Sequence, residues 1–298
     1  MTDASDETAT PDDSDDEQGA RTARVHPRNQ LNDLSGREWI RFTRSWFVHN
    51  PPRRSRSQIL HPAKFPEALV GEFIRYFTKV GETVLDPFAG TGSTLLAACE
   101  TGRHGVGVEV NSRYVELARR HLGAHAGPHS VFHDDASRVE ELFRAHQLPP
   151  VDFVMTSPPY WNMLGQSRGN VLSAHKRRKA SGLDVVYSES DENDLGNESD
   201  YTRFLDRLAA VFLGVRAVLR RNRYLVVVVQ NLRAPEGRMV PLAWDLTARL
   251  EQWYTFKGER IWCQDNKPLG IWGYPSEYVS NVHHHYCLVF KNDLLTTR

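Results

Sequence analysis

The sequence predicts an α/β protein with a doubly wound, mainly parallel sheet of about seven strands, one of them antiparallel. From residue 66 onward, short apolar runs alternate with helical stripes of apolar residues, which is the pattern of successive βαβ units. The run Tyr224–Val229 is almost wholly apolar, as expected for a central parallel strand. The last two predicted strands are joined by a loop that contains glycine and proline but no helical stripe. Such a direct return makes one of these two strands antiparallel.

The helices are marked by apolar stripes and by residues that begin or end a helix. Pro66 begins the first stripe and Gly102 ends the second helix, whereas Asn111 and Ser199 can cap the helices that follow them. These signals predict helices over residues 66–78, 93–100, 111–122, 137–145 and 241–253, and a long helix after Ser199. Between the helices, strands are predicted over residues 83–86, 105–109, 130–133, 151–156, 224–229, 255–262 and 284–290.

Length and composition describe one large domain with insertions. The chain has 298 residues, of which 40% are hydrophobic and 25% are charged, as in ordinary globular proteins. No apolar run comes near the ~20 residues that cross a bilayer, and the acidic N-terminus has no signal-peptide pattern. We therefore expect a cytoplasmic protein without a membrane partner.

The three cysteines, Cys99, Cys263 and Cys287, are far apart and odd in number, which argues against a disulfide framework and a zinc knuckle.

Charge is distributed unevenly along the chain. Residues 1–20 hold eight acidic side chains and no basic one, so the remainder has 37 basic and 29 acidic residues. We predict a disordered acidic tail over residues 1–25 and an N-terminal extension with a basic linker over residues 26–60. The aromatic-rich part of this extension should dock on the main domain, residues 61–298. A basic body suits a polyanionic partner.

A glycine turn follows the first strand of the main domain. The run Asp86-Pro-Phe-Ala-Gly-Thr-Gly-Ser93 lies between a strand and a helix, so Gly90 and Gly92 would let a ligand approach bare backbone amides. We expect valine at either glycine to fill the space of the ligand and to leave folding largely intact. Glu109 ends the next strand, where an acid can accept both hydroxyls of a ribose. Leu95 replaces the third glycine of a dinucleotide fingerprint, which favours a nucleoside ligand without a pyrophosphate.

A second polar turn, Thr156-Ser-Pro-Pro-Tyr-Trp161, follows another apolar strand. Because ligands of open α/β sheets bind beyond the carboxyl ends of the strands, both turns should face one cleft. This pair of turns resembles the DNA amino-methyltransferases, which use S-adenosylmethionine. The resemblance covers about residues 58–291. It implies a Rossmann-like methyltransferase sheet as the fold and double-stranded DNA as the partner. The glycine turn precedes the Ser-Pro-Pro-Tyr turn, which leaves target recognition to segments after residue 161.

The resemblance also implies roles for individual residues in cofactor binding. His61, Lys64 and Phe65 would hold the methionine end of S-adenosylmethionine, Glu109 its ribose and Asp135 its adenine amino group. The full cofactor set implied in this way is His61, Lys64, Phe65, Asp86, Phe88, Gly90, Gly92, Ser93, Glu109, Val110, Asp135 and Ala136.

The Ser-Pro-Pro-Tyr turn suits the chemistry of a base amine. That amine is conjugated with its ring, so its lone pair is a poor nucleophile, and acceptors near its hydrogens favour the tetrahedral nitrogen that attack requires. The Ser157 hydroxyl and the Pro158 carbonyl can be these acceptors, Pro159 stiffens the turn, and Tyr160 can stack on the base. A base in a duplex must be flipped out to reach such a pocket. These four residues are the predicted catalytic set.

The first position of this turn indicates which base is modified. Ser-Pro-Pro-Tyr is most similar to the branch of the family that methylates cytosine N4, whereas Asp or Asn is usual for adenine N6. We therefore expect a cytosine-N4 DNA methyltransferase, either the partner of a restriction endonuclease or an orphan regulatory methylase. Adenine-N6 methylation of DNA, base methylation of RNA and a non-catalytic cofactor sensor are the alternatives. The intact catalytic turn and glycine turn argue against a non-catalytic sensor.

The insertion over residues 162–198 is the first candidate for DNA recognition. It is long, polar and poor in periodicity, which is typical of a functional or disordered loop. Its basic run can contact phosphates and consists of Lys176, Arg177, Arg178 and Lys179. A solvated basic loop is the alternative.

The loop over residues 264–281 is the second candidate. Asn266 and Lys267 can read base edges, and its aromatic residues can fill the gap left by a flipped base. The adjacent run His283–His285 is not expected to bind a metal, because neighbouring residues of a strand point to opposite faces. We expect exposed imidazoles at the entry of a strand there.

Overall fold

The computed structural model describes residues 24–50, 66–123, 129–161, 195–234 and 237–294. Most of the predicted acidic tail, part of the basic linker and most of the insertion lie outside these residues. The strands of the main sheet are β1 (Trp46–Val48), β2 (Thr83–Asp86), β3 (His104–Glu109), β4 (Ser130–His133), β5 (Val151–Thr156), β6 (Leu219–Val229), β9 (Thr255–Cys263) and β10 (His284–Lys291). A small hairpin pairs β7 (Leu232–Arg233) with β8 (Met239–Val240).

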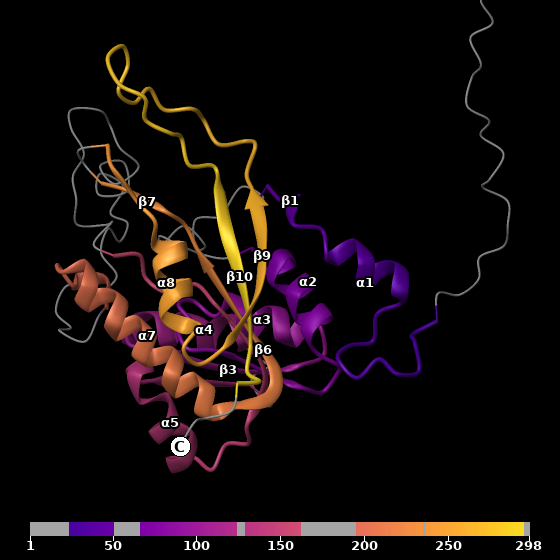
Figure 1. Ribbon diagram of the computed structural model, residues 1–298. Helices are drawn as coiled ribbons and strands as arrows, with labels where there is room; N and C mark the ends of the chain where they lie inside the picture. Colours follow the sequence, from indigo (N-terminus) through magenta and orange to yellow (C-terminus); the bar gives the residue numbers. More distant parts are fainter. Residues whose placement is uncertain (1–23, 51–65, 124–128, 162–194, 235–236, 295–298) are drawn as a thin grey trace, which may run out of the picture.

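The eight strands lie in the order β1-β9-β10-β6-β5-β2-β3-β4. The strands β1, β9, β10 and β6 are labelled in Figure 1. β10 is antiparallel to both of its neighbours, β6 and β9, whereas the other pairings of this sheet are parallel. The structure thus confirms the predicted doubly wound sheet with one antiparallel strand. The eighth strand is β1, which the sequence did not predict and which the N-terminal extension adds beside β9.

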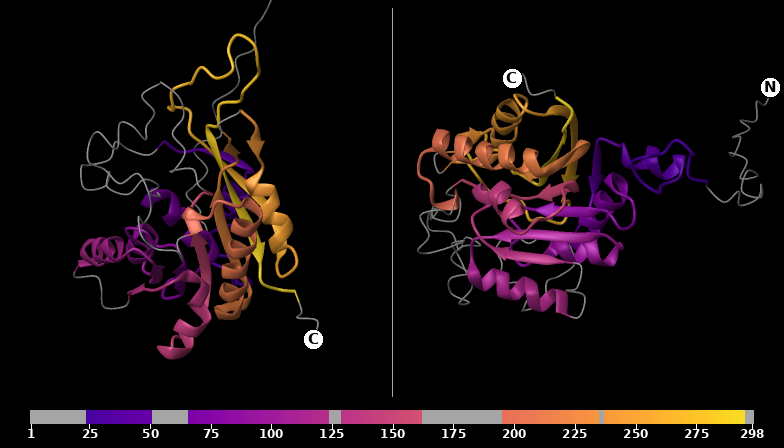
Figure 2. Two further views of the ribbon diagram at one scale, coloured as in Figure 1. Left: turned by 90° about the vertical axis from the view of Figure 1, so that its left-hand side faces the viewer. Right: turned by 90° about the horizontal axis from the view of Figure 1, so that it is seen from below.

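The helices cover both faces of this sheet (Figure 2). They are α1 (Gly36–Phe42), α2 (Glu67–Phe77), α3 (Ser93–Glu100), α4 (Ser112–Leu122), α5 (Val139–Ala145), α7 (Tyr201–Val218) and α8 (Leu242–Leu250). The short 3-10 turns η2 (Ala136–Arg138) and η3 (Leu195–Asn197) precede α5 and α7. The apolar residues of α2 and α3 form one core with one face of the sheet, and those of α5, α7 and α8 form a second core with the other. Val226 lies in the first core and Val227 in the second, which explains why β6 is apolar at successive positions.

Two predicted boundaries were wrong in detail. The long helix α7 is capped by Asp200 and not by Ser199, because the Asp200 carboxylate accepts a hydrogen bond from the Arg203 amide at 2.7 Å. The central strand begins at Leu219, five residues before the apolar run. The prediction missed these first residues because they include polar, largely exposed side chains.

The N-terminal extension packs on the main domain, as its aromatic residues predicted. The Phe42 ring stacks on Tyr76 of α2 with 4.0 Å between ring centroids. The Arg260 guanidinium lies 3.9 Å from the centre of the Phe42 ring on the same patch. The Asn32 side chain donates a hydrogen bond to the Tyr76 carbonyl at 2.5 Å. These contacts hold α1 and β1 on the side of α2.

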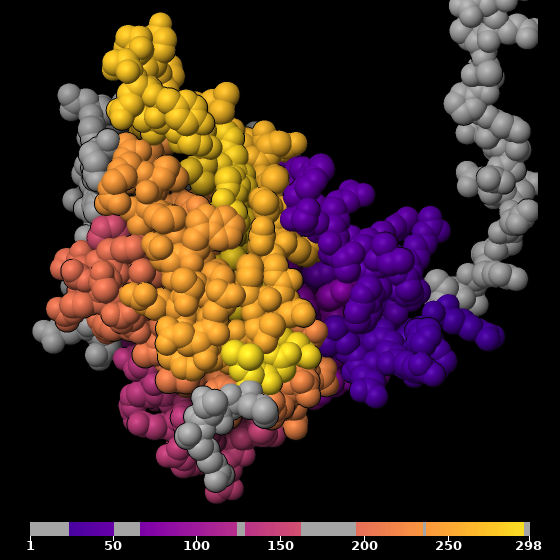
Figure 3. Space-filling view, in the orientation of Figure 1, coloured from indigo at the N-terminus to yellow at the C-terminus, as the bar shows by residue number. Residues whose placement is uncertain are grey.

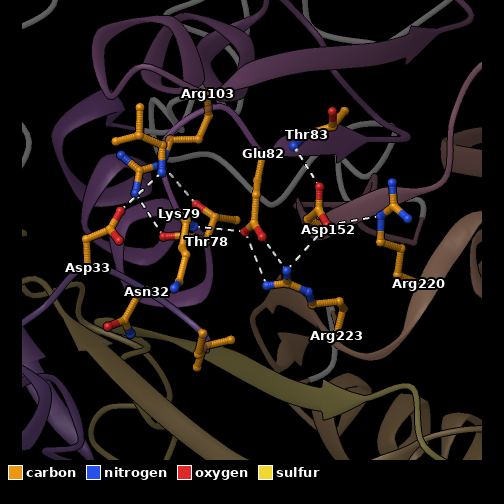
Figure 4. Close-up of polar contacts among 12 residues, drawn as sticks. Asn32, Asp33, Thr78, Lys79, Glu82, Thr83, Arg103, Asp152, Arg220 and Arg223 are labelled. Atoms are coloured by element: carbon orange, nitrogen blue, oxygen red, sulfur yellow. Dashed lines mark hydrogen bonds and ion pairs between the residues drawn. The ribbon is translucent and has the colours of Figure 1, made fainter. Parts of the chain in front are cut away.

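A polar network lines the amino edge of the sheet (Figure 4). Arg223 forms an ion pair with Glu82, and its guanidinium lies 3.5 Å from the carboxylate of Asp152. Asp152 also pairs with Arg220 at 3.1 Å and accepts a hydrogen bond from the Thr83 amide at 3.0 Å. These charges pair with one another across β2, β5 and β6, so the network ties the three strands together at the edge opposite the two polar turns.

The chain reverses its direction of winding between β2 and β5. From β2 it proceeds through β3 to β4, and it then returns to place β5 on the other side of β2. Such a switch point opens a crevice beyond the carboxyl ends of the two strands. The glycine turn follows β2 and the Ser-Pro-Pro-Tyr turn follows β5, so the fold brings both to this crevice.

None of the helices in the described part of the chain is long and apolar enough to cross a membrane.

Candidate active site

Asp86 joins the two turns at the switch point. Its carboxylate accepts hydrogen bonds from the hydroxyls of Thr156 and Thr94, each at 2.6 Å, and from the Phe88 amide at 3.0 Å. Asp86 is 3% exposed. Burial raises the pKa of its carboxyl group to about 6, although the three hydrogen bonds act in the opposite direction. Because Thr156 directly precedes Ser157, Asp86 fixes the glycine turn against the start of the catalytic turn.

Gly90 and Gly92 both adopt the left-handed conformation, with φ of 52° and 84°. The Gly90 amide donates to the Glu109 carboxylate at 2.7 Å, which ties the turn to the end of β3. A Cβ at Gly92 would lie 2.9 Å from the Cβ of Ala118 on α4. The expectation that valine at Gly92 leaves folding largely intact was therefore wrong, since this glycine is required by its backbone angle and by the packing of α4.

Glu109 lies at the carboxyl end of β3, beside the glycine turn. One carboxylate oxygen accepts from Gly90, and the other accepts from the Asn111 amide at 2.9 Å. The side chain is partly exposed, so it is oriented by two backbone amides and still reaches solvent. A carboxylate held in this way can accept further hydrogen bonds from vicinal hydroxyls.

The other described members of the cofactor set surround this turn. Ser93 is the first residue of α3. Its hydroxyl is buried and has no hydrogen-bond partner among the described residues. Asp135 and Ala136 follow the neighbouring strand β4, and the Asp135 carboxylate accepts from the Ser137 amide at 2.8 Å to cap η2. Phe88 packs against the core beneath the turn, and the Val110 carbonyl contacts His133 at 2.9 Å.

The catalytic turn leaves β5 between the glycine turn and the strands β6 and β10. β5 is buried along its whole length, whereas Ser157, Pro159 and Tyr160 regain partial exposure and Pro158 stays buried. Burial raises the pKa of the Tyr160 phenol to about 12, although the neighbouring Ser157 side chain acts in the opposite direction. The phenol therefore carries its proton at neutral pH. Trp161 lies 5.0 Å from Tyr201 of α7, between ring centroids, and extends the aromatic wall.

The structure adds His285 and Trp262 to this site, which the sequence analysis missed. The Nδ1 atom of His285 lies 3.3 Å from the Tyr160 hydroxyl, and its ring stacks on Trp262 at 4.6 Å. The expectation of exposed imidazoles was wrong, because His283, His284 and His285 are all partly buried. The sequence signal that could have revealed His285 was the expected antiparallel direction of the last strand. An antiparallel strand begins at the edge of the sheet where the parallel strands end, which is the edge of the catalytic turn.

The loop between β9 and β10 forms an arm that extends beyond the sheet (Figures 1 and 3). Arg233 of β7 contacts this arm, because its guanidinium lies 3.7 Å from the centre of the Trp272 ring and donates to the Ser280 carbonyl at 3.0 Å. Asn266 is exposed, as a base-reading residue requires. Lys267 is half-buried instead, and this burial lowers the pKa of its amine.

Seven of the predicted site residues lie outside the described residues and stay predictions. They are His61, Lys64, Phe65, Lys176, Arg177, Arg178 and Lys179. Within the described ranges, no three His, Cys, Asp or Glu side chains are grouped so as to hold a metal ion.

Comparison with known proteins identifies relatives of this chain. A family model for DNA methylases matches residues 7–120, a span that contains the glycine turn and Glu109 and ends before Ser157. Type II methyltransferase M.BglI of Bacillus subtilis is 34% identical over 91 residues, which cover 30% of this chain and 26% of that protein. DNA adenine methyltransferase YhdJ of Escherichia coli is 42% identical over 62 residues, covering 21% of each chain.

The matched segments span about a quarter of the length of these relatives. Among solved structures, TrmN from Thermus thermophilus aligns with a TM-score of 0.47 at 14% identity, covering 78% of this chain and 50% of that one. Over the matched segments this chain is therefore similar to DNA methylases and to DNA methyltransferases.

Proposed function

We propose that this protein transfers a methyl group from S-adenosylmethionine to the exocyclic N4 amine of a flipped-out cytosine in DNA. One observation carries the proposal: the glycine turn and the Ser-Pro-Pro-Tyr turn leave the two strands that flank the switch point. The 2.6 Å hydrogen bond between Asp86 and Thr156 holds the two turns together. A nucleoside bound at the first turn and a base bound at the second would therefore be neighbours.

The residues around the glycine turn fit a nucleoside-containing cofactor. The buried Ser93 hydroxyl is available to a ligand at the start of α3, and the Glu109 carboxylate is held at the end of β3 for the ribose hydroxyls. Asp135 follows the next strand and is proposed to receive the adenine amino group. When bound, S-adenosylmethionine supplies a methyl group on a sulfonium centre, which is open to attack by a nitrogen lone pair.

The residues of the catalytic turn fit the other reactant, an amine on a nucleobase. The Ser157 hydroxyl and the Pro158 carbonyl are proposed to accept hydrogen bonds from the amine and so to favour a tetrahedral nitrogen. The protonated Tyr160 phenol carries no charge, and its ring can stack on the base. Pro158 and Pro159 remove two backbone donors and restrict the turn, so the acceptors are fixed before the base arrives.

The choice of cytosine rests on Ser157 as the first residue of the catalytic turn. One relative is by name a DNA adenine methyltransferase, so adenine N6 is the second candidate base. We favour cytosine N4 because the Ser-Pro-Pro-Tyr form is most similar to the cytosine branch.

The proposed substrate is a DNA duplex, and exposed aromatic residues on the arm support this proposal. The arm between β9 and β10 extends from the edge that holds the catalytic turn (Figure 1). It carries Tyr274 and Tyr278, which are 82% and 90% exposed, and exposed aromatic rings can stack on unpaired bases. We propose that this arm and the basic insertion contact the duplex around the flipped base. A restriction endonuclease of the same sequence specificity is the proposed partner, unless the protein is an orphan methylase.

Mass spectrometry of treated DNA tests the proposal. Unmethylated genomic DNA and bulk RNA are incubated separately with the protein and methyl-labelled S-adenosylmethionine, and the nucleosides released by nuclease digestion are identified. Label in N4-methylcytosine from DNA is expected. Label in N6-methyladenine would overturn the cytosine assignment, and label in RNA alone would overturn the assignment to DNA.

A further inference from the structure

A neutral histidine lies between two aromatic rings at the base side of the site. His285 is the second residue of β10 and pairs in register with Trp262 of β9. Its imidazole stacks on the Trp262 ring at 4.6 Å with an interplanar angle of 23°, and its Nδ1 atom lies 3.3 Å from the Tyr160 hydroxyl. Trp262 is itself fixed, because its indole N–H donates to the His49 carbonyl at 2.8 Å. The histidine therefore connects Tyr160 to a rigid part of the sheet.

The hydrogen bond between His285 and Tyr160 joins two uncharged side chains. Burial is the largest cause that lowers the pKa of His285, the charges of Lys267 and His284 act in the same direction, and the resulting pKa is about 3. The imidazole is thus neutral at physiological pH, while the Tyr160 phenol is protonated. In the neutral tautomer that carries its hydrogen on Nε2, Nδ1 of His285 accepts a hydrogen bond from the Tyr160 hydroxyl, and this is the tautomer that the inference assumes.

We propose that His285 is a positioning residue, which fixes the ring of Tyr160 through this hydrogen bond in the orientation that stacks on the target base. The inference rests on the proposed function, since it assumes that Tyr160 contacts the base. The histidine thereby orients the stacking ring of the catalytic turn.

A role for His285 as a general base is less consistent with the same geometry. A group whose pKa lies near 3 is a weak proton acceptor at neutral pH. Positioning requires only a neutral acceptor that does not move. The stacking on Trp262 and the cross-strand register provide this rigidity.

Two substitutions of His285 separate the acceptor from the bulk of the ring. His285→Asn keeps an acceptor near the place of Nδ1, whereas His285→Leu fills similar space without one. We expect His285→Leu to lower kcat for DNA methylation by about 3- to 10-fold, the equivalent of one neutral hydrogen bond, with unchanged affinity for S-adenosylmethionine. His285→Asn should recover most of this loss. Because the effect passes through the phenol, His285→Leu should have no further effect in a Tyr160→Phe background.

A spectroscopic measurement tests the positioning even in the absence of methyl transfer. The protein is labelled with 3-fluorotyrosine, and Tyr160→Phe identifies the ¹⁹F resonance of Tyr160. His285→Leu should shift this resonance, and His285→Asn should restore it toward the wild-type position. His284→Leu is the matched control, because His284 contacts Tyr286 and not Tyr160. An unshifted Tyr160 resonance in His285→Leu, or additive losses of kcat in the double variant, would overturn the inference. If the wild-type protein transfers no methyl group, the proposed function fails, and the ¹⁹F shift still decides whether His285 fixes Tyr160.

Discussion

The carboxylate of Asp86 accepts a hydrogen bond from the hydroxyl of Thr156 at 2.6 Å, across the switch point of the sheet. Asp86 belongs to the glycine turn and Thr156 immediately precedes the catalytic turn, so one buried contact sets the distance between the two halves of the site. Asp86 therefore has a structural role that its place in a cofactor motif does not reveal. Its three hydrogen-bond donors come from the Phe88 amide and from the hydroxyls of Thr94 and Thr156.

Asp86→Asn should change how the free energy of unfolding depends on pH. Burial raises the pKa of Asp86 from its ordinary value of 3.8 to about 6, so the folded protein binds this proton more tightly than the unfolded chain does. The stability contributed by this group is fully present below about pH 4 and is lost as pH rises through about 6, by up to about 3 kcal/mol. Asparagine cannot ionise and should show no such loss.

Urea unfolding of the wild type and Asp86→Asn between about pH 4 and pH 7 measures this difference. The free energy of the wild type relative to the variant should fall across this interval and become constant above it. Other carboxyl groups titrate in both proteins and cancel in the comparison. A difference that is independent of pH would show that Asp86 is ionised throughout and would contradict the prediction.

Gly92→Ala should destabilise the protein more than Gly81→Ala. Both glycines have nearly the same φ, 84° and 82°, so both substitutions incur the cost of a left-handed residue, about 1–2 kcal/mol. Only Gly92 faces Ala118 at 2.9 Å, whereas nothing lies within 4 Å of a Cβ at Gly81. Thermal or urea unfolding should show an excess loss of about 1–3 kcal/mol for Gly92→Ala. Adding Ala118→Gly should recover part of it, and equal losses at the two glycines would exclude the contact with α4 as the cause.

Glu109→Ala should weaken the binding of S-adenosylmethionine by about 1–3 kcal/mol, the range for lost hydrogen bonds to a charged group. The substitution removes the acceptor proposed for the ribose and also leaves the amides of Gly90 and Asn111 without this partner. Glu109→Gln keeps an acceptor oxygen, so its affinity for S-adenosylmethionine should lie between those of the wild type and Glu109→Ala. Calorimetric titration measures the affinities, with Glu116→Ala on the exposed face of α4 as the control. Unchanged affinity in Glu109→Ala would remove this residue from the cofactor site.

Tyr278→Ala should weaken DNA binding without lowering the melting temperature. The side chain is 90% exposed on the arm, so its loss costs little packing, while each stacked base is worth about 1–3 kcal/mol. Fluorescence anisotropy with duplex DNA measures the affinity, and Ile40→Ala is the control, because Ile40 is also exposed but lies on α1. If both variants bind DNA as the wild type does, the arm does not contact the duplex.

The sequence predicts the sheet well because its strands carry strong local signals. β2, β4 and β5 occupy the predicted residues, since each is a short apolar run between helices with clear boundaries. β1 was missed because its three residues become a strand only through pairing with β9, which is more than 200 residues away in the chain. A contact of this range leaves no periodic pattern in a three-residue segment.

The same distinction applies to the candidate site. The two turns could be found because glycine and proline mark special backbone conformations at fixed positions. His285 could not, because its role depends on a hydrogen bond to Tyr160, 125 residues earlier, and on stacking against Trp262. Lys267 shows the opposite case: a polar side chain on a long loop predicted a surface contact, but this side chain is half-buried.

The most direct test of this account compares methyl transfer and cofactor affinity in Tyr160→Ala. The account places the cofactor at the glycine turn and the base at Tyr160, so the two measurements should separate. Transfer of labelled methyl groups to DNA should fall by about a hundredfold or more, because the base loses the surface that orients it. The dissociation constant for S-adenosylmethionine should stay close to that of the wild type. Undiminished transfer, or an equal loss of cofactor binding and of transfer, would contradict the assignment of the two turns to two halves of one active site.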